Sequence, residues 1–400
     1  MSLDDSQIHT TTDLSATLMS EGKRRRGILF LALACAAVGM AVSLQVALNE
    51  NFVVEEIHLS GYEKGLLEAI RESCGITALG LLALLAGLAE PLIGVAMLLL
   101  VGVGLAGYAG VRDFTWLWIL SVVWSQGLHI WMPLPNSMML SLAEPGRTGR
   151  RLGQLQAAGA AGSLGILVLI LSLNWAGLSI RPMYLIGGTA AVLGAVACLG
   201  IPRDIKTPGP RFVMRRRYSL YYLLSFLEGW RKQIFLAFAG FLLVKVYSVP
   251  LKAMLTMWTI GLAITWLAAP LAGRLVDRLG ERITLYFYYV AIIAVFVAYA
   301  LVRDARVLCG LYMADNILFT LGLALTTYVR RIAPPEEHTP TLSMGVAMNH
   351  VAAVAMPLAG GLLWQRMGYQ WTFGLGVVAA LMSFLAVSRL PARQAPGPVA

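Results

Sequence analysis

Charged side chains interrupt several long apolar stretches of the sequence. Glu228, Arg231 and Lys232 stand in the middle of one such stretch, at residues 218–245. A carboxyl group can take up and release a proton, and the two bases can bind an anionic group. Spacings of three and four residues place Glu228 beside each base on a helix. The stretch therefore predicts proton exchange, anion binding or both.

The charges of this group do not cancel. An internal pair of Glu228 with Arg231 or Lys232 neutralises two charges and leaves a positive surplus. Either another helix supplies an acid, for which Asp315 is the natural candidate, or the site receives an anion. We therefore expect Arg231 and Lys232 to bind substrate, and Glu228 and Asp315 to take part in proton coupling.

Polar residues at a comparable depth occur in two further apolar stretches. Asp315 is followed by Asn316, and Asn349 is followed by His350. Histidine has a reference pKa of about 6.5, so His350 is a candidate for proton exchange, with a hydrogen-bonded core histidine as the alternative. Asn316, Asn349 and Gln126 are predicted substrate contacts, although packing between helices explains them as well.

A second charged group, Glu68, Arg71 and Glu72, lies in the stretch at residues 63–86. On a helix the two acids are one turn apart with the arginine beside them. Arg71 is a predicted substrate contact and Glu72 a predicted proton-coupling residue. The alternative is an ion-pair cluster at the membrane interface, because all three residues fall within the first ten of the stretch.

The composition identifies the environment of these charges. Of the 400 residues, 58% are hydrophobic and 13% charged, against about 45–50% and about 25% in soluble domains. These values predict a polytopic helical membrane protein and exclude soluble enzymes, disordered scaffolds and secreted disulfide folds. A charge at the centre of a membrane helix costs roughly 2.5–3.5 kcal/mol, so such residues are functional candidates.

The elements that position these residues are twelve predicted transmembrane helices in an all-α fold. They are expected at residues 27–49, 63–86, 92–110, 114–141, 153–173, 182–200, 218–245, 250–272, 283–303, 306–330, 341–364 and 369–389. The basic segment 201–217 contains three prolines and divides two six-helix halves, 27–200 and 218–389. Tails at 1–26 and 390–400 complete the predicted organisation.

The basic residues predict the orientation. With a cytoplasmic N-terminus, the inside segments hold 20 of the 31 Lys and Arg residues, and the outside segments hold eight. Lysine and arginine accumulate on the cytoplasmic side of membrane proteins. Both termini are therefore predicted in the cytoplasm, with the chain spanning a bacterial inner membrane. The net charge of +10 is a topology signal and does not indicate nucleic-acid binding.

The segment Gly273-Arg274-Leu275-Val276-Asp277-Arg278-Leu279-Gly280-Glu281-Arg282 follows the eighth predicted helix. It resembles the loop signature G-x-x-x-D-R-x-G-x-R of the major facilitator superfamily of transporters. With twelve helices and a central linker, the resemblance covers residues 27–389. It implies two halves that alternately expose a central cavity, and a gating role for Gly273, Arg274, Asp277, Arg278, Gly280 and Arg282. A solvated basic loop is the alternative.

The first half departs from the family pattern. Its equivalent loop, residues 87–92, contains no arginine, and Glu90 is its only charge. The family's antiporter signature is absent from residues 153–165, while a related fragment, Pro357-Leu358-Ala359-Gly360-Gly361, occurs near the end of the chain. These departures weaken the interpretation as a typical drug antiporter.

No cofactor or metal site is predicted. The pattern Gly102-x-Gly104-x-x-Gly107 matches a dinucleotide motif, but it lies inside a membrane helix with no preceding strand. Small residues that allow close helix packing explain it better. The four cysteines stand singly in apolar segments, without metal-ligand spacing.

These features predict a secondary active transporter, monomeric in the lipid bilayer, that moves a small organic solute by alternating access. Coupling to protons, or to another ion, is expected because buried acids are present and no ATP-binding motif occurs. A solute with an anionic group is the leading option. The alternatives are an exporter of amphipathic or cationic compounds held by Glu228 and Asp315, and a non-transporting receptor or assembly subunit.

Overall fold

The computed structural model describes residues 20–144, 147–206 and 214–390, which are nearly all helical. The predicted tails and linker thus lie partly outside the described residues. The helices are α2 (Glu21–Asn51), α3 (Gly61–Leu84), α4 (Glu90–Gly107), α5 (Phe114–Trp131), α6 (Leu134–Leu142), α7 (Thr148–Trp175), α8 (Ile180–Cys198), α9 (Ser219–Lys245), α10 (Leu251–Leu301), α11 (Ala305–Leu318), α12 (Leu323–Ile332), α13 (Pro335–Met367) and α14 (Tyr369–Val387). Short π or 3₁₀ segments are η1 (Phe52–Glu56), η2 (Tyr108–Gly110), η3 (Arg216–Tyr218) and η4 (Phe319–Gly322).

Within the described ranges, eight helical stretches are long and apolar enough to cross a membrane. The predicted helical membrane protein is confirmed, and the count of twelve spans remains a prediction. The other four expected spans are less apolar or less continuous than these eight. Helices α3 and α9 carry several charges, the fourth span is divided into α5 and α6, and the eighth begins with the shorter apolar helix Leu251–Thr265.

Two breaks in the helices follow from proline and glycine. The fourth span is interrupted where α5 ends at Trp131 and α6 begins beyond Pro133, because proline cannot donate a helical hydrogen bond. The loop expected at 273–282 is shorter than predicted, since α10 is helical on both sides of Gly280. Gly280 has φ 77° and Gly87, in the equivalent loop of the first half, has φ 84°. Glycine adopts such values without steric cost.

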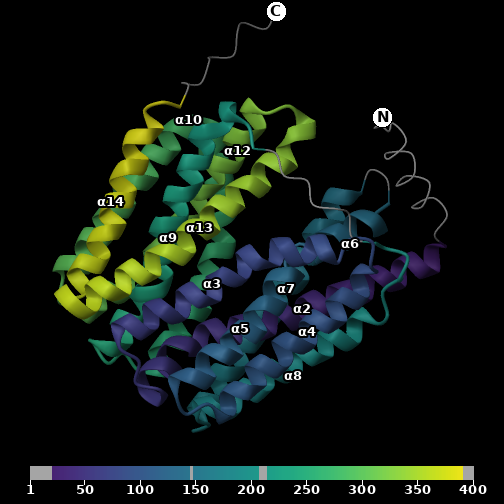
Figure 1. Ribbon diagram of the computed structural model, residues 1–400, viewed down its shortest axis with the longest axis horizontal. Coiled ribbons are helices and arrows are strands. Elements are labelled where there is room, and N and C mark those ends of the chain that lie inside the picture. Colours follow the sequence, from purple (N-terminus) through teal and green to yellow (C-terminus); the bar gives the residue numbers. More distant parts are fainter. Residues whose placement is uncertain (1–19, 145–146, 207–213, 391–400) are drawn as a thin grey trace, which may run out of the picture. The chain divides into compact units, whose positions relative to one another are not determined.

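Contacts divide the chain into two compact units, the first formed by Met1–Leu48 and Thr77–Pro210. In this unit α4 packs between α5 and α8 (Figure 1). A Cβ at Gly102 would lie 3.1 Å from the carbonyl oxygen of Gly188 on α8. The small residues of the glycine pattern therefore face neighbouring helices at close range.

The start of the linker belongs to this first unit. Ala89 and Lys206 form an isolated antiparallel bridge, and the Glu90 amide donates to the Ile205 carbonyl at 2.8 Å. Lys23 pairs with Asp204, and the Ile205 side chain is buried. Residues 201–206 are thus fastened to the loop between α3 and α4.

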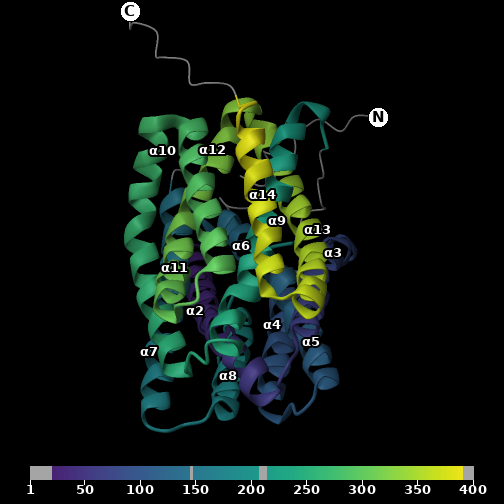
Figure 2. The ribbon, with the colours of Figure 1, turned by 90° about the vertical axis from the view of Figure 1, so that its left-hand side faces the viewer.

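The second unit comprises Asn49–Ile76 and Arg211–Ala400. Helix α9 packs against both α13 and α14, which Figure 2 shows beside it. The boundary between the units crosses α2 and α3, whose adjoining ends pack with the C-terminal helices. A Cβ at Gly65 of α3 would clash with the Pro357 carbonyl of α13, and Gly361 lies against the Gly61 carbonyl. The fragment that resembles an antiporter signature therefore provides a close helix contact here.

Candidate functional site

A buried ionic cluster lies on α9 in the second unit. Arg231 is fully buried, and its Nη2 donates to Glu228 Oε1 at 2.6 Å. Its Nη1 donates to Asp315 Oδ1 of α11 at 3.2 Å. The second acid expected from the sequence thus lies beside the arginine. Both terminal nitrogens of Arg231 are engaged by carboxyl groups, so the protein itself supplies anionic partners for its charge.

Tyr288 of α10 completes this cluster and was not predicted. Its hydroxyl lies 2.7 Å from Glu228 Oε1 and accepts a hydrogen bond from Arg231 Nη2 at 2.7 Å. The phenol is fully buried. Nothing in the sequence distinguishes it from Tyr286 and Tyr289, because its role depends on packing between α9 and α10.

Lys232 differs from its neighbour Arg231. It is half-buried, and its Nζ lies 5.9 Å from the centre of the Phe319 ring. Among the described residues it makes no ion pair or hydrogen bond. The Arg231 guanidinium lies 5.7 Å from the same ring, so one aromatic side chain contacts both bases.

The two predicted asparagines take different positions. Asn316 donates to the Tyr312 carbonyl of its own helix at 2.8 Å. Asn349 lies where α13 approaches Gly229 of α9, since a Cβ at that glycine would be 2.6 Å from the Asn349 carbonyl. Asn349 therefore lies against the residue that follows Glu228 on α9.

His350 pairs with α3. Its Nδ1 lies 3.4 Å from Glu72 Oε2, and its ring fills the space beside Gly75. The two residues predicted for proton coupling outside the α9 cluster are thus brought together, 278 positions apart in the sequence (350 − 72).

Arg71 belongs to a second buried network. Its Nη2 lies 2.9 Å from Glu68 Oε2, and Lys64 Nζ lies 2.8 Å from both Glu68 and Glu50. Lys64 is fully buried. Glu68 and Arg71 therefore belong to a largely buried ion-pair network that also includes Glu50 and Lys64. The spacing of Lys64 and Glu68 was the available signal, since it allows an i,i+4 pair.

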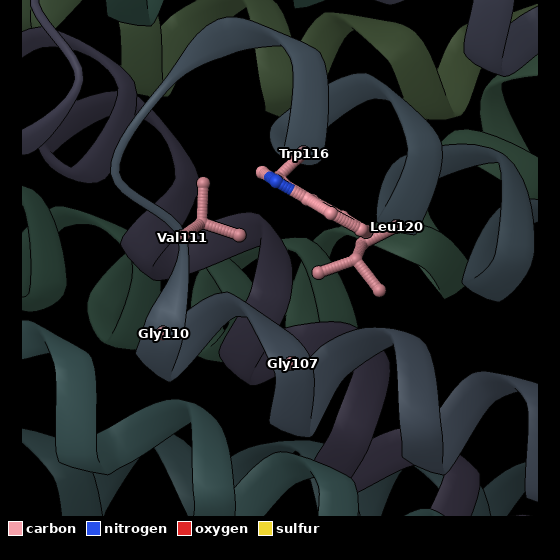
Figure 3. Close-up of a pocket in the computed structure, with 5 residues that line it drawn as sticks. All are labelled: Gly107, Gly110, Val111, Trp116 and Leu120. Carbon is pink, nitrogen blue, oxygen red and sulfur yellow. The ribbon is translucent and has the colours of Figure 1, made fainter.

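Gln126 lies in the first unit, where it accepts a hydrogen bond from Thr77 at 2.6 Å. That unit also contains a cavity of about 260 Å³ lined by Gly107, Gly110, Val111, Trp116 and Leu120. Val111 faces Trp116 and Leu120 across it (Figure 3). None of the predicted site residues lines this cavity.

The predicted gating segment contains the ends of two helical parts. Gly273, Arg274, Asp277 and Arg278 lie before the break at Gly280, and Arg282 follows it. The Arg282 guanidinium lies 5.8 Å from the Tyr286 ring centre. Glu281, next to the break, pairs with Arg331 of α12 at 3.3 Å.

The acids of two further ion pairs lie outside the eight apolar helical stretches. Arg151 donates to both oxygens of Glu144, at 2.5 and 2.9 Å, and these hydrogen bonds lower the pKa of Glu144 to about 2. Glu337 accepts hydrogen bonds from Tyr218 and Arg217, which lower the pKa of this carboxyl. Both acids are therefore ionised at neutral pH.

Residues 259–400 match the family model of the Major Facilitator Superfamily. The predicted resemblance to this superfamily is confirmed. No curated protein matches the chain by sequence. Among solved structures, the nucleoside transporter NupG has a TM-score of 0.74 at 15% identity, with 91% of this chain and 99% of that chain covered.

Two other transporters share the major facilitator fold with this chain. The D-xylose-proton symporter has a TM-score of 0.68 at 15% identity, covering 90% of this chain and 97% of that one. A bacterial homologue of the lysosomal transporter Spinster, inward-facing and unoccupied, has a TM-score of 0.69 at 15% identity, covering 92% and 98%. At these identities the likeness shows the fold alone.

Proposed function

We propose that the chain is a secondary active transporter that moves a small organic solute by alternating access, coupled to protons. The observation that carries the proposal is Arg231, which is fully buried between Glu228 and Asp315 at mid-helix. Ionisable groups in such positions mark ion and substrate pathways in membrane proteins. The transporter fold and the family match support the same class.

The coupling site in this proposal is the cluster of Glu228, Arg231, Asp315 and Tyr288. Two carboxylates share one guanidinium, so these three groups by themselves carry one surplus negative charge, which one proton on the acid pair removes. Release of that proton leaves Arg231 with two ionised partners. Because the acids lie on α9 and α11, the two states favour different positions of these helices.

The remaining predicted roles follow from the same mechanism. Glu72 and His350 form a second titratable contact, between α3 and α13. Asn316, Asn349, Gln126 and Arg71 are proposed substrate contacts, and residues 273–282 a cytoplasmic gate. The proposal also includes a monomer in the inner membrane of a bacterial cell with both termini in the cytoplasm, an orientation that the distribution of basic residues supports.

Proton flux in proteoliposomes tests the proposal. Vesicles with a trapped pH-sensitive dye receive a panel of organic anions, cations and neutral solutes. We expect at least one solute to drive proton movement with the wild-type protein, and Asp315→Asn and Glu228→Gln to reduce it more than tenfold. Proton movement that is unchanged in both variants, at normal protein levels, would exclude this coupling site.

A further inference from the structure

Two adjacent bases of α9 have different electrostatic surroundings. Arg231 has a carboxylate on each terminal nitrogen, whereas Lys232 has no anionic partner among the residues that the structure describes. The Lys232 ammonium lies 5.9 Å from the centre of the Phe319 ring. A ring face attracts a cation only weakly and, unlike a carboxylate, does not neutralise its charge.

Lys232 cannot reach the membrane surface. It is the middle residue of α9, which extends from Ser219 to Lys245, so each end is roughly 20 Å away. That distance is much longer than a lysine side chain. Most of α9 is buried, but Leu236, one turn after Lys232, is 47% exposed. A charged lysine facing lipid at this depth is unfavourable, which favours a water-filled path along this face.

We propose that Lys232 binds the anionic group of the transported solute, and that this binding favours protonation of the Glu228–Asp315 pair. The inference rests on the proposed transport function and names its substrate class, an organic anion. With all four residues ionised, the charges of Lys232, Arg231, Glu228 and Asp315 sum to zero. A bound carboxylate makes the sum negative, and one proton restores neutrality.

Linkage makes this coupling reciprocal: the anion favours proton binding, and the proton favours anion binding by the same factor. Arg231 of α9 faces the acid pair, together with the phenols Tyr288, Tyr289, Tyr299 and Tyr312 of α10 and α11. Arginine stays charged and phenols stay neutral between pH 5.5 and 8. Of these groups, the two carboxyls are therefore the ones whose charge can change in that range, while His350 of α13 contacts Glu72 of α3.

Binding of simple carboxylates to the purified full-length protein tests the inference. The probes are acetate, butyrate and benzoate, each compared with its uncharged amide, and the readout is the thermal shift in detergent. We expect at least one carboxylate to stabilise the wild type while its amide does not. The apparent affinity should rise about tenfold from pH 8 to pH 5.5.

Three variants separate the roles. Lys232→Gln should lose the carboxylate effect and Lys232→Arg should retain most of it, and the melting temperature without ligand checks that each is folded. Asp315→Asn should still bind the carboxylate, with a smaller dependence on pH. Stabilisation that persists in Lys232→Gln, or that occurs with none of the three carboxylates, would overturn the inference. These measurements need no flux, so they are independent of the transport experiment.

Discussion

Arg231 and Asp315 are 84 positions apart in the sequence, yet Nη1 of the arginine lies 3.2 Å from Oδ1 of the aspartate. Glu228 holds the other terminal nitrogen. The contact joins α9 to α11 in the interior of the second unit, where the arginine has no access to solvent. Removing one charged partner from this contact would therefore leave an uncompensated charge buried in the protein, which is strongly destabilising.

Replacing Arg231 with glutamine should destabilise the protein by about 3–5 kcal/mol, because two buried acids then lack their base. Asp315→Asn should have a smaller effect, since Glu228 remains. Unfolding in detergent measures both effects. The double variant Arg231→Gln/Asp315→Asn should lose less unfolding free energy than the sum of the losses in the two single variants. Losses that add within about 0.5 kcal/mol would show that the two residues are not coupled.

Lys64→Met should also destabilise the protein, again by about 3–5 kcal/mol, because it leaves Glu50 and Glu68 buried together without their shared lysine. Lys245→Met is the matched control, since Lys245 is exposed at the end of α9. The control should change the unfolding free energy by no more than about 0.5 kcal/mol. Equal effects of the two substitutions would contradict the structural role of the buried network.

The contact between α3 and α13 can be tested with two glycines of the same helix. A Cβ at Gly65 would clash with the Pro357 carbonyl, whereas a Cβ at Gly80 would meet no atom within 4 Å. Gly65→Ala should lower the melting temperature because α3 must move away from α13. Gly80→Ala should raise stability by about 0.5–1 kcal/mol, since alanine favours the helix. A stable, fully folded Gly65→Ala protein would argue against this close contact.

The Glu144–Arg151 pair predicts a stability difference that depends on pH. Hydrogen bonds from Arg151, above all, lower the pKa of Glu144 from its ordinary value of 4.5 to about 2 in the folded protein. A carboxyl whose pKa is lower in the folded than in the unfolded protein stabilises the fold at pH values above its unfolded pKa. This stabilisation is lost as the pH falls from 4.5 toward 2. The free energy of unfolding of the wild type should therefore exceed that of Glu144→Gln by about 1 kcal/mol at pH 7. This difference should shrink below pH 4.5. A constant difference from pH 7 to pH 3 would contradict this assignment.

The sequence contained enough information for the membrane fold and for the principal acid–base pair. Glu228 and Arg231 are three residues apart on one helix, and the unbalanced charge required an acid from elsewhere, which Asp315 supplies. The interruption at Pro133 was equally predictable, because it depends on one residue type. These features follow from local spacing and from the cost of charge in a membrane.

Other parts of the site depend on packing that local spacing does not encode. Tyr288 reaches Glu228 from 60 positions away, and Glu50 meets Lys64 across the turn between α2 and α3. The sequence also does not reveal that Arg231 contacts two acids whereas Lys232 contacts only an aromatic ring among the described residues. Adjacent residues on a helix point about 100° apart, so their surroundings depend on which helices pack on each side. The extent of the loop around Gly280 was overestimated, because polar residues there indicated a loop while the backbone needs only one glycine to turn.

Residues 201–206 are bound to the first unit, so deletions at different places in the linker between the halves should differ in their effect. A deletion that includes Asp204 and Ile205 would remove an ion pair, a buried side chain and the hydrogen bond to Glu90. A deletion that begins after Lys206 would leave all three intact. The tether that joins the halves is therefore shorter than the seventeen residues of segment 201–217, because its first six residues are anchored.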